Sequence, residues 1–161
     1  MSRALDVNHV SVCADDLATS IRWYEEMFGM EELPTPNFGF PVRWLRAGDH
    51  QLHLFERPGS APTYHHVGLT VDEIEPIYLR AKELGCFDTA AFAHHLLELP
   101  GDCVQLYLRD PAGNLVEVNA PNASRLPDTV LADMVRLADL EPQSEDNLRA
   151  RLSLSVRTAA R

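Results

Sequence analysis

The chain has 161 residues, of which 45% are hydrophobic, and its formal net charge at pH 7 is −10. This length and this share of apolar residues allow a buried core in one domain or in two small, similar halves. The negative charge argues against a surface for nucleic acid or for an anionic membrane, because both partners require a basic footprint.

Cysteine usage and the N-terminus indicate an intracellular setting. Three scattered cysteines, Cys13, Cys86 and Cys103, form neither a CxxC zinc motif nor an even-numbered disulfide framework, so we expect reduced thiols. The first residues, MSRALDVNHVSV, lack the basic start and apolar run of a signal peptide, and no stretch reaches about 18 consecutive apolar residues. We therefore expect a cytoplasmic protein without a membrane segment.

The elements expected along the chain repeat once. Residues 7–30, VNHVSVCADDLATSIRWYEEMFGM, predict a strand, an acidic turn and an amphipathic helix that ends at Gly29, and residues 42–56 predict two further strands around a GD turn. The same order returns in YHHVGLTVDEIEPIYLRAKELGC (64–86), with a helix ending at Gly85, and in LYLRDPAGNLVEVNA (106–120). Each half therefore predicts a βαβββ module.

These boundaries define four parts of an α+β chain. Residues 1–57 form the first module, 58–63 a Pro- and Gly-containing linker, 64–121 the second module and 122–161 a C-terminal helical extension. Within the extension, DTVLADMVRLADL (128–140) predicts an amphipathic helix with Asp128 as its N-cap. The last stretch, residues 148–161, predicts either a second helix or a frayed tail.

Polar side chains recur on one face of four expected strands. Successive side chains of a strand point to opposite faces, and in each of these strands the apolar neighbours are expected to pack on the helices. The residues left on the other face are His9, His53, His66 and Glu117, with His9 matching His66 and His53 matching Glu117 across the repeat. Imidazoles with one carboxylate favour a divalent Zn, Fe, Ni, Co or Mn ion. The sequence therefore predicts a metal site, which requires a curved sheet because neighbouring strands lie about 4.8 Å apart.

The remaining histidines are weaker candidates for metal ligands. By alternation His65 falls on the helix side next to the linker, and His50 falls in the turn before a strand, so we expect structural or solvated roles for both. His94 and His95 begin the strand-like run HHLLEL, and one of them is a candidate to reach the cavity.

Four segments carry a resemblance to a known family: NHVSVCADDLATSIRWYEEMFGM, QLHLFE, HHVGLTVDE and YLRDPAGNLVEV. Together they resemble the vicinal oxygen chelate superfamily, which includes glyoxalase I, extradiol dioxygenases, methylmalonyl-CoA epimerase, fosfomycin-modifying enzymes and bleomycin-resistance proteins. The resemblance covers roughly residues 7–120, and its most specific part is the motif DPAGNLVE. It implies two βαβββ modules that form curved mixed sheets around one divalent metal ion, which chelates two adjacent oxygens of the substrate.

The resemblance also implies residue roles. His9, His66 and Glu117 match ligand positions of the family, and His53 matches the remaining one, where glyoxalase I-like enzymes tend to have Glu and the epimerase Gln. In a glyoxalase-like lyase or isomerase, the favoured reaction, Glu117 is the candidate base and His53 can accept a proton. In an extradiol dioxygenase, His9, His66 and Glu117 would hold Fe(II), with Tyr107 as an acid-base group and His53 as a base.

A third possibility is a non-catalytic drug-binding protein, although the filled set of ligand positions counts against it. Aromatic residues near the expected site suit a small organic substrate, and Arg43, Arg46 and Arg109 are candidates to hold one anionic group. His53 and His66 are only 13 residues apart, so the linker restrains how the modules pack. We expect a homodimer in which His9 and His53 of one chain face His66 and Glu117 of the partner subunit, with a site inside one chain as the alternative.

Overall fold

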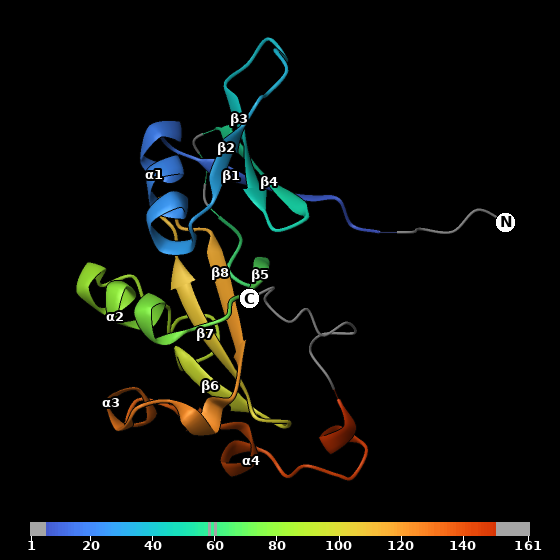
Figure 1. Ribbon diagram of the computed structural model, residues 1–161, viewed down its shortest axis with the longest axis vertical. Helices are drawn as coiled ribbons and strands as arrows, with labels where there is room; N and C mark the ends of the chain where they lie inside the picture. The colour runs from blue at the N-terminus through green and yellow to red at the C-terminus, as the bar shows by residue number, and fades with distance from the viewer. Residues whose placement is uncertain (1–5, 58, 60, 151–161) are drawn as a thin grey trace, which may run out of the picture. The chain divides into compact units, whose positions relative to one another are not determined.

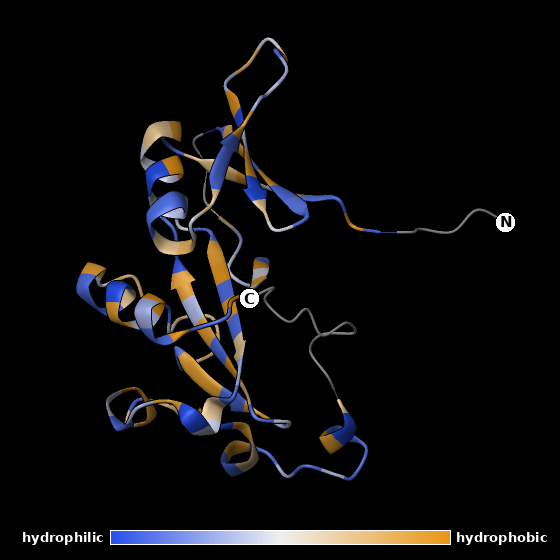
Figure 2. Ribbon diagram, in the orientation of Figure 1, coloured by the Kyte–Doolittle hydropathy of each residue, from blue (hydrophilic) through white to orange (hydrophobic). Residues whose placement is uncertain are grey.

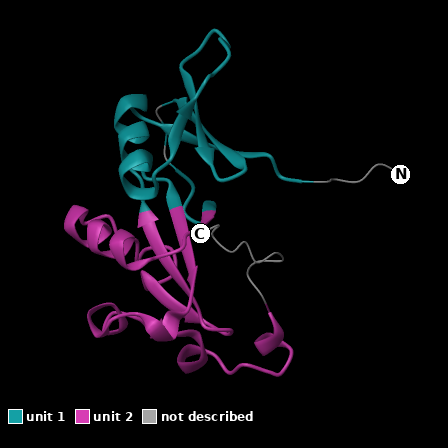
Figure 3. Ribbon diagram, viewed as in Figure 1, with its two compact units in different colours: residues 1–67, 109–115 teal, residues 68–108, 116–161 magenta. Residues whose placement is uncertain are grey.

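The computed structural model describes residues 6–57, 59 and 61–150. The chain divides into two compact units, one of residues 1–67 and 109–115 and the other of residues 68–108 and 116–161 (Figure 3). A four-stranded sheet lies in the first unit and a five-stranded sheet lies mainly in the second. Residues 109–115 belong to the second half of the sequence repeat but group with the first unit.

The first unit contains a sheet with the strand order β1-β4-β3-β2 (Figure 1). Its strands are β1 (His9–Ala14), β2 (Glu31–Leu33), β3 (Val42–Ala47) and β4 (His50–Glu56). β1 runs parallel to β4, whereas β3 is antiparallel to both of its neighbours. Helix α1 (Leu17–Phe28) connects β1 to β2 and packs on β3 and β4.

Alternation along the strands explains which face α1 covers. Leu45, Leu52 and Leu54 are almost completely buried and share one side of the sheet with each other, and the buried side of α1 supplies further apolar residues such as Met27. The alternating colours along the strands in Figure 2 follow this pattern. The helix begins after Asp16, whose carboxylate accepts a hydrogen bond from the Thr19 backbone N–H at 2.7 Å, and ends at Gly29.

The second sheet has the strand order β5-β8-β7-β6-β9. Its strands are β5 (His66–Thr70), β6 (Leu96–Leu99), β7 (Cys103–Arg109), β8 (Leu115–Pro121) and β9 (Val135–Arg136). Helix α2 (Glu75–Leu84) lies beside this sheet in Figure 1 and ends at Gly85, as predicted. The observed elements therefore confirm the expected α+β fold with a repeated βαβββ order.

The C-terminal extension differs from its prediction. Instead of one helix over 128–140, the chain forms two one-turn helices, α3 (Asp128–Leu131) and α4 (Leu137–Leu140), separated by strand β9. Short 3₁₀ turns occupy Ala123–Arg125 and Asn147–Arg149, and residues 151–161 lie outside the described part. The N-cap of α3 is Pro127 rather than Asp128.

Tertiary contacts account for the break in that helix. β9 adds a parallel strand to the edge of β6, with Leu97 opposite Val135 and Glu98 opposite Arg136. The Arg136 guanidinium also pairs with the Glu98 carboxylate at 3.0 Å. Pairing with an open sheet edge and an ion pair outweigh the weak helical preference of a β-branched residue such as Val135.

The DPAGN motif forms the turn between β7 and β8. The buried Asp110 carboxylate accepts hydrogen bonds from the backbone N–H groups of Ala112 (3.0 Å) and Asn114 (2.8 Å), from the Asn114 amide (2.7 Å) and from the Tyr24 hydroxyl (3.0 Å). The Asn114 amide also donates to the Cys13 carbonyl at 2.7 Å. The DPAGN turn therefore stabilises the first unit through its first and last residues, Asp110 and Asn114.

None of the helices in the described part of the chain is long and apolar enough to cross a membrane.

Candidate functional site

His9 and His53 come together on the first sheet. Their rings stack with centroids 4.2 Å apart and an angle of 11° between the ring planes. On the other side of His53, the Trp44 ring stacks at 4.5 Å and 7°. His53 therefore lies in a stack of three rings, and only 7% of its surface is exposed, whereas His9 is exposed.

The electrostatics of His53 favour a neutral ring. Burial, and secondly the proximity of His9, lower the pKa of His53 below the ordinary value of 6.5. His53 Nε2 also lies 2.8 Å from Gln51 Oε1, and because that oxygen can only accept, the neutral ring carries its proton on Nε2. His53 is therefore held by hydrogen bonding to its own strand as well as by stacking.

His9 and His66 share a different hydrogen-bonding pattern. His9 Nδ1 contacts Asn8 Oδ1 at 2.5 Å, and His66 Nδ1 donates to the Tyr64 carbonyl at 2.7 Å. Both acceptors precede their histidine by one or two residues, and both place the ring proton on Nδ1, so that Nε2 carries the lone pair. His66 is the first residue of β5, and His65 lies outside the strand and is exposed.

Glu117 lies on β8 in a buried polar cluster of the second unit. Its Oε1 atom accepts hydrogen bonds from Gln105 Nε2 at 2.8 Å and from Asn119 Nδ2 at 2.9 Å. The Tyr107 hydroxyl donates to Gln105 Oε1 at 3.0 Å. Burial, followed by the negative charge of Glu117, raises the pKa of Tyr107 well above its ordinary value, so Tyr107 is protonated at neutral pH.

The other two candidate histidines, His94 and His95, lie in the second unit. The His94 ring lies 6.1 Å from that of Tyr107, and its Nε2 is buried without a hydrogen-bond partner. His95 stacks on Phe87 at 4.3 Å, and its Nε2 lies 3.9 Å from the Asp133 carboxylate of the extension. Of the two, His94 is thus the one that approaches the polar cluster around Glu117.

Four of the five predicted site residues fall into two groups, and His66, at the start of β5, contacts the Tyr64 carbonyl instead. His9 and His53 meet in the first unit, and Tyr107 joins the cluster of Glu117 in the second. Within residues 6–57, 59 and 61–150, no three metal-ligating side chains of the His, Cys, Asp and Glu types form a group that could hold an ion. Sequence reasoning did not assign roles to Gln105 and Asn119, although strand alternation places them on the same faces as Tyr107 and Glu117.

The three arginines considered for an anionic substrate have partners in the structure. Arg43 pairs with Glu32 at 3.1 Å and Arg46 with Glu31 at 3.7 Å. Arg109 donates to the carbonyls of Gly113 and Thr63 at 3.0 and 3.1 Å. The ion pairs of Arg43 and Arg46 are exposed to solvent and contribute little to stability, so a role of the three arginines in holding an anionic group stays a prediction.

An aromatic cluster continues from Trp44 along the first unit. Phe38 lies 5.9 Å from Trp44 and 5.8 Å from Phe40, and Phe40 lies 5.8 Å from Phe55, all measured between ring centroids. The guanidinium of Arg57 lies 5.4 Å from the centre of the Phe40 ring. Phe38 and Phe40 are exposed, so an apolar surface extends from the stacked histidines.

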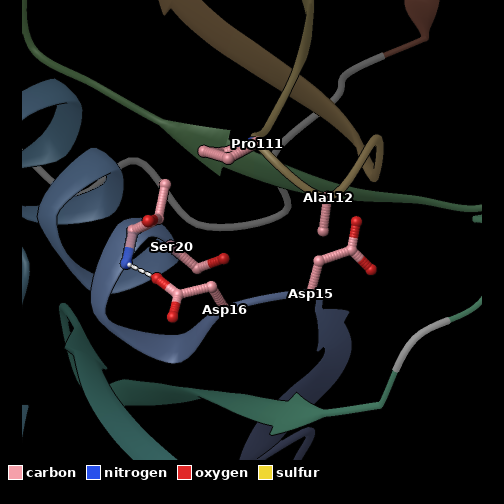
Figure 4. A pocket seen from close by; sticks show the side chains of 6 residues that line it. Asp15, Asp16, Ser20, Pro111 and Ala112 are labelled. Carbon is pink, nitrogen blue, oxygen red and sulfur yellow. Dashed lines mark hydrogen bonds between the residues drawn. The ribbon is translucent and has the colours of Figure 1, made fainter.

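Two small pockets lie away from these residues. Figure 4 shows the first, of about 70 Å³, at the start of α1, lined by Asp15, Asp16, Thr19, Ser20, Pro111 and Ala112. The second, of about 170 Å³, lies between the β6–β7 turn and the extension. Organic ligands usually occupy pockets of roughly 300–1,000 Å³, so neither pocket has the size of a substrate site.

Comparisons with known proteins agree on one fold. The structure is similar to lactoylglutathione lyase from Agrobacterium tumefaciens, with a TM-score of 0.56 and 22% identity over 78% of this chain and 100% of that one. It is also similar to the genomically encoded fosfomycin resistance protein FosX from Listeria monocytogenes, with a TM-score of 0.62 and 17% identity over 76% of this chain and 96% of that one. No curated protein sequence matches the chain.

The likeness to solved structures, at sequence identities of 17–22%, establishes the fold of the chain. The family to which the chain belongs is established by a separate match to a family model. The model of the Glyoxalase/Bleomycin resistance protein/Dioxygenase superfamily matches residues 6–118, which include both βαβββ modules almost completely. The chain therefore belongs to the Glyoxalase/Bleomycin resistance protein/Dioxygenase superfamily, the vicinal oxygen chelate superfamily that its sequence motifs resemble.

Proposed function

We propose that the chain is a metal-dependent enzyme that acts on two adjacent oxygen atoms of a small organic substrate, in a glyoxalase-like lyase or isomerase reaction. The observation that carries this proposal is the shared hydrogen-bonding pattern of His9 and His66. Metal-binding histidines commonly donate one ring N–H to a nearby oxygen, which fixes the tautomer and directs the other nitrogen to the ion. Nδ1 of each histidine contacts such an oxygen, at equivalent points of the two modules.

The donor set has the chemistry of a divalent metal site. We propose His9, His66 and Glu117 as protein ligands, a combination of two neutral imidazoles and one carboxylate that suits Fe, Ni, Zn, Co or Mn. When bound, such an ion acts as a Lewis acid that stabilises negative charge developing on the substrate oxygens. Family membership supports this assignment, because the matched range includes all three residues and the sequence resemblance places them at ligand positions of the superfamily.

Three residues of the chain would transfer protons or donate hydrogen bonds in this reaction. In the proposed reaction Glu117 accepts a proton from the carbon next to the substrate oxygens, as a carboxylate base. His53 is neutral because its pKa is lowered, and its Nδ1 carries the lone pair, so it can accept a proton beside the site. Tyr107 remains protonated and acts as a hydrogen-bond donor.

One observation favours a second candidate function. His53 Nε2 donates to Gln51, so His53 presents its lone pair on Nδ1, whereas His9 and His66 present theirs on Nε2. This difference separates His53 from the other two histidines and leaves three ligands of one pattern. Three ligands of the two-histidine, one-carboxylate type match non-haem Fe(II) oxygenases. An extradiol-type dioxygenase is therefore the alternative to the lyase or isomerase.

We further propose that the enzyme is a homodimer, with His9 and His53 of one chain facing His66 and Glu117 of the partner subunit. The short connection between His53 and His66 supports this arrangement, because it limits how far the two modules of one chain can rearrange. Analytical ultracentrifugation at micromolar concentration tests it. A monomeric protein that binds one metal ion per chain would favour the site within one chain.

Metal analysis tests the proposed enzyme. Protein purified without chelators should contain about one divalent ion per set of ligands, and His66→Ala should lose it. His65→Ala is the matched control, because this neighbouring residue is exposed and lies outside β5. A wild-type protein that binds none of Fe, Ni, Zn, Co or Mn would refute the enzyme proposal in favour of a drug-binding protein.

Oxygen consumption separates the two reactions. If the protein contains metal, we expect no oxygen uptake with catechols and isomerisation or lyase activity with 2-oxoaldehyde adducts of thiols. Metal-dependent oxygen uptake with a catechol would assign the dioxygenase reaction instead.

A further inference from the structure

We propose that Gln105 and Asn119 are positioning residues for Glu117, and that their two amide groups orient its carboxylate for metal binding. This inference rests on the proposed function, because it assigns a purpose to the ligand Glu117. Both amides donate to the same oxygen, Oε1, at 2.8 and 2.9 Å. We call this arrangement the amide cradle of Glu117.

The orientation of the Gln105 amide follows from its neighbours. The protonated Tyr107 hydroxyl donates to Gln105 Oε1, so the NH₂ group of Gln105 must point to the carboxylate. All three side chains are more than nine-tenths buried. The cradle thus forms a directional chain, from Tyr107 through Gln105 to Glu117, in a buried environment where hydrogen bonds to a charged group are strong.

Asn119 supplies the second donor at a cost. Its Nδ2 bonds to Glu117, but its Oδ1 is buried and is one of four buried side-chain atoms in the described part of the chain without a hydrogen-bond partner. A buried acceptor without a partner lowers the stability of the folded chain. If the amide were turned over, two oxygens would repel each other across 2.9 Å, so the interaction with Glu117 determines this orientation.

The cradle borders an open position of the sheet. Gly68 on the neighbouring strand β5 is exposed, and a side-chain carbon built there would lie 3.8 Å from Asn119 Nδ2 and 3.9 Å from Glu117 Oε1. Because Gly68 has no side chain, nothing from this position of β5 covers the Glu117 carboxylate. A buried and oriented carboxylate next to an open position is an arrangement expected for a ligand rather than for a core residue.

Two variants remove one donor each and keep the side-chain volume similar. Gln105→Met and Asn119→Leu should each weaken the binding of Co²⁺ by about 10–100-fold, the usual effect of removing a residue that orients a metal ligand. Isothermal titration calorimetry measures the affinity. The visible absorption of bound Co²⁺, which depends on ligand geometry, should also change in both variants.

Val118→Ala is the matched control. Val118 lies between Glu117 and Asn119 on the same strand, is fully buried and points to the opposite face. This variant should lower the stability of the second unit, as shortening a buried side chain does, while Co²⁺ affinity stays within about twofold of the wild type. A loss of stability alone therefore cannot produce the expected pattern.

The outcomes separate this inference from the proposed function. If wild-type protein binds Co²⁺ and both donor variants bind it equally well, or lose no more affinity than Val118→Ala, the positioning role is refuted while the metal site stands. If the wild type does not bind Co²⁺, the proposed function and the positioning role are both refuted. Weaker binding with an altered Co²⁺ spectrum in both donor variants, but not in Val118→Ala, supports the positioning role.

Discussion

Replacing Tyr24 by phenylalanine removes a single hydroxyl group from the core of the first unit. Tyr24 is fully buried in α1, and its hydroxyl donates to Asp110 Oδ2 at 3.0 Å. The other donor to that oxygen is the Asn114 amide at 2.7 Å. The substitution keeps the aromatic ring, so its effect reports the hydrogen bond between α1 and the DPAGN turn.

The expected loss follows from the charge and burial of the acceptor. Burial raises the pKa of Asp110 above its ordinary value, while its hydrogen bonds act in the opposite direction. A hydrogen bond to a charged buried group contributes about 1.5–3 kcal/mol. We therefore expect Tyr24→Phe to lower the free energy of unfolding by about 2 kcal/mol, close to a 30-fold change in the unfolding equilibrium.

Urea unfolding at pH 7, followed by tryptophan fluorescence, measures this loss. Both tryptophans of the chain, Trp23 and Trp44, lie in the first unit, so the signal reports on the unit that contains the bond. In an Asp110→Asn background the same substitution should cost clearly less, because the charged acceptor is gone. A Tyr24→Phe protein within about 0.5 kcal/mol of the wild type would refute the reasoning, since that is the range of surface changes.

Three further predictions concern helix ends, the extension and pH. Gly29→Ala should lower the free energy of unfolding by about 1 kcal/mol in urea titrations, because Gly29 ends α1 with a φ of 61° that favours glycine. The Asp133 carboxylate accepts a hydrogen bond from the Tyr78 hydroxyl and so holds the extension to α2. Asp133→Asn should therefore speed hydrogen exchange in residues 128–140 while β7 and β8 stay protected. Unchanged exchange in residues 128–140 would contradict this role of Asp133. Burial lowers the pKa of His95 below 6.5, so the unfolded chain binds its proton first and stability should fall as the pH drops through about 6.5. His95→Gln should flatten that slope in unfolding curves measured between about pH 7.5 and 5.5, and an equal slope would show that other groups cause it.

The arrangement of the site residues could be predicted only in part. Alternation placed His9, His53, His66 and Glu117 on one face of their strands, because side-chain direction in a strand depends only on position along it. The stack of His53 between His9 and Trp44, and the hydrogen bond of His53 to Gln51, depend on the register between strands. Register involves atoms far apart in the sequence, so no local pattern could predict them.

The sequence by itself determined the repeated βαβββ order, the helix ends at Gly29 and Gly85 and the family of the chain, because these features follow from alternation, helical periodicity and the conformational freedom of glycine. Only the tertiary structure decided the role of Asp110, whose buried carboxylate depends on a donor 86 residues away in α1. It also turned the expected helix over 128–140 into two short helices and a strand, since the open edge of β6 satisfies the backbone of β9 better than a helix would. Finally, the amide cradle of Glu117 exists only because β7 and β8 are neighbours in one sheet, which brings amide donors from two strands to one oxygen.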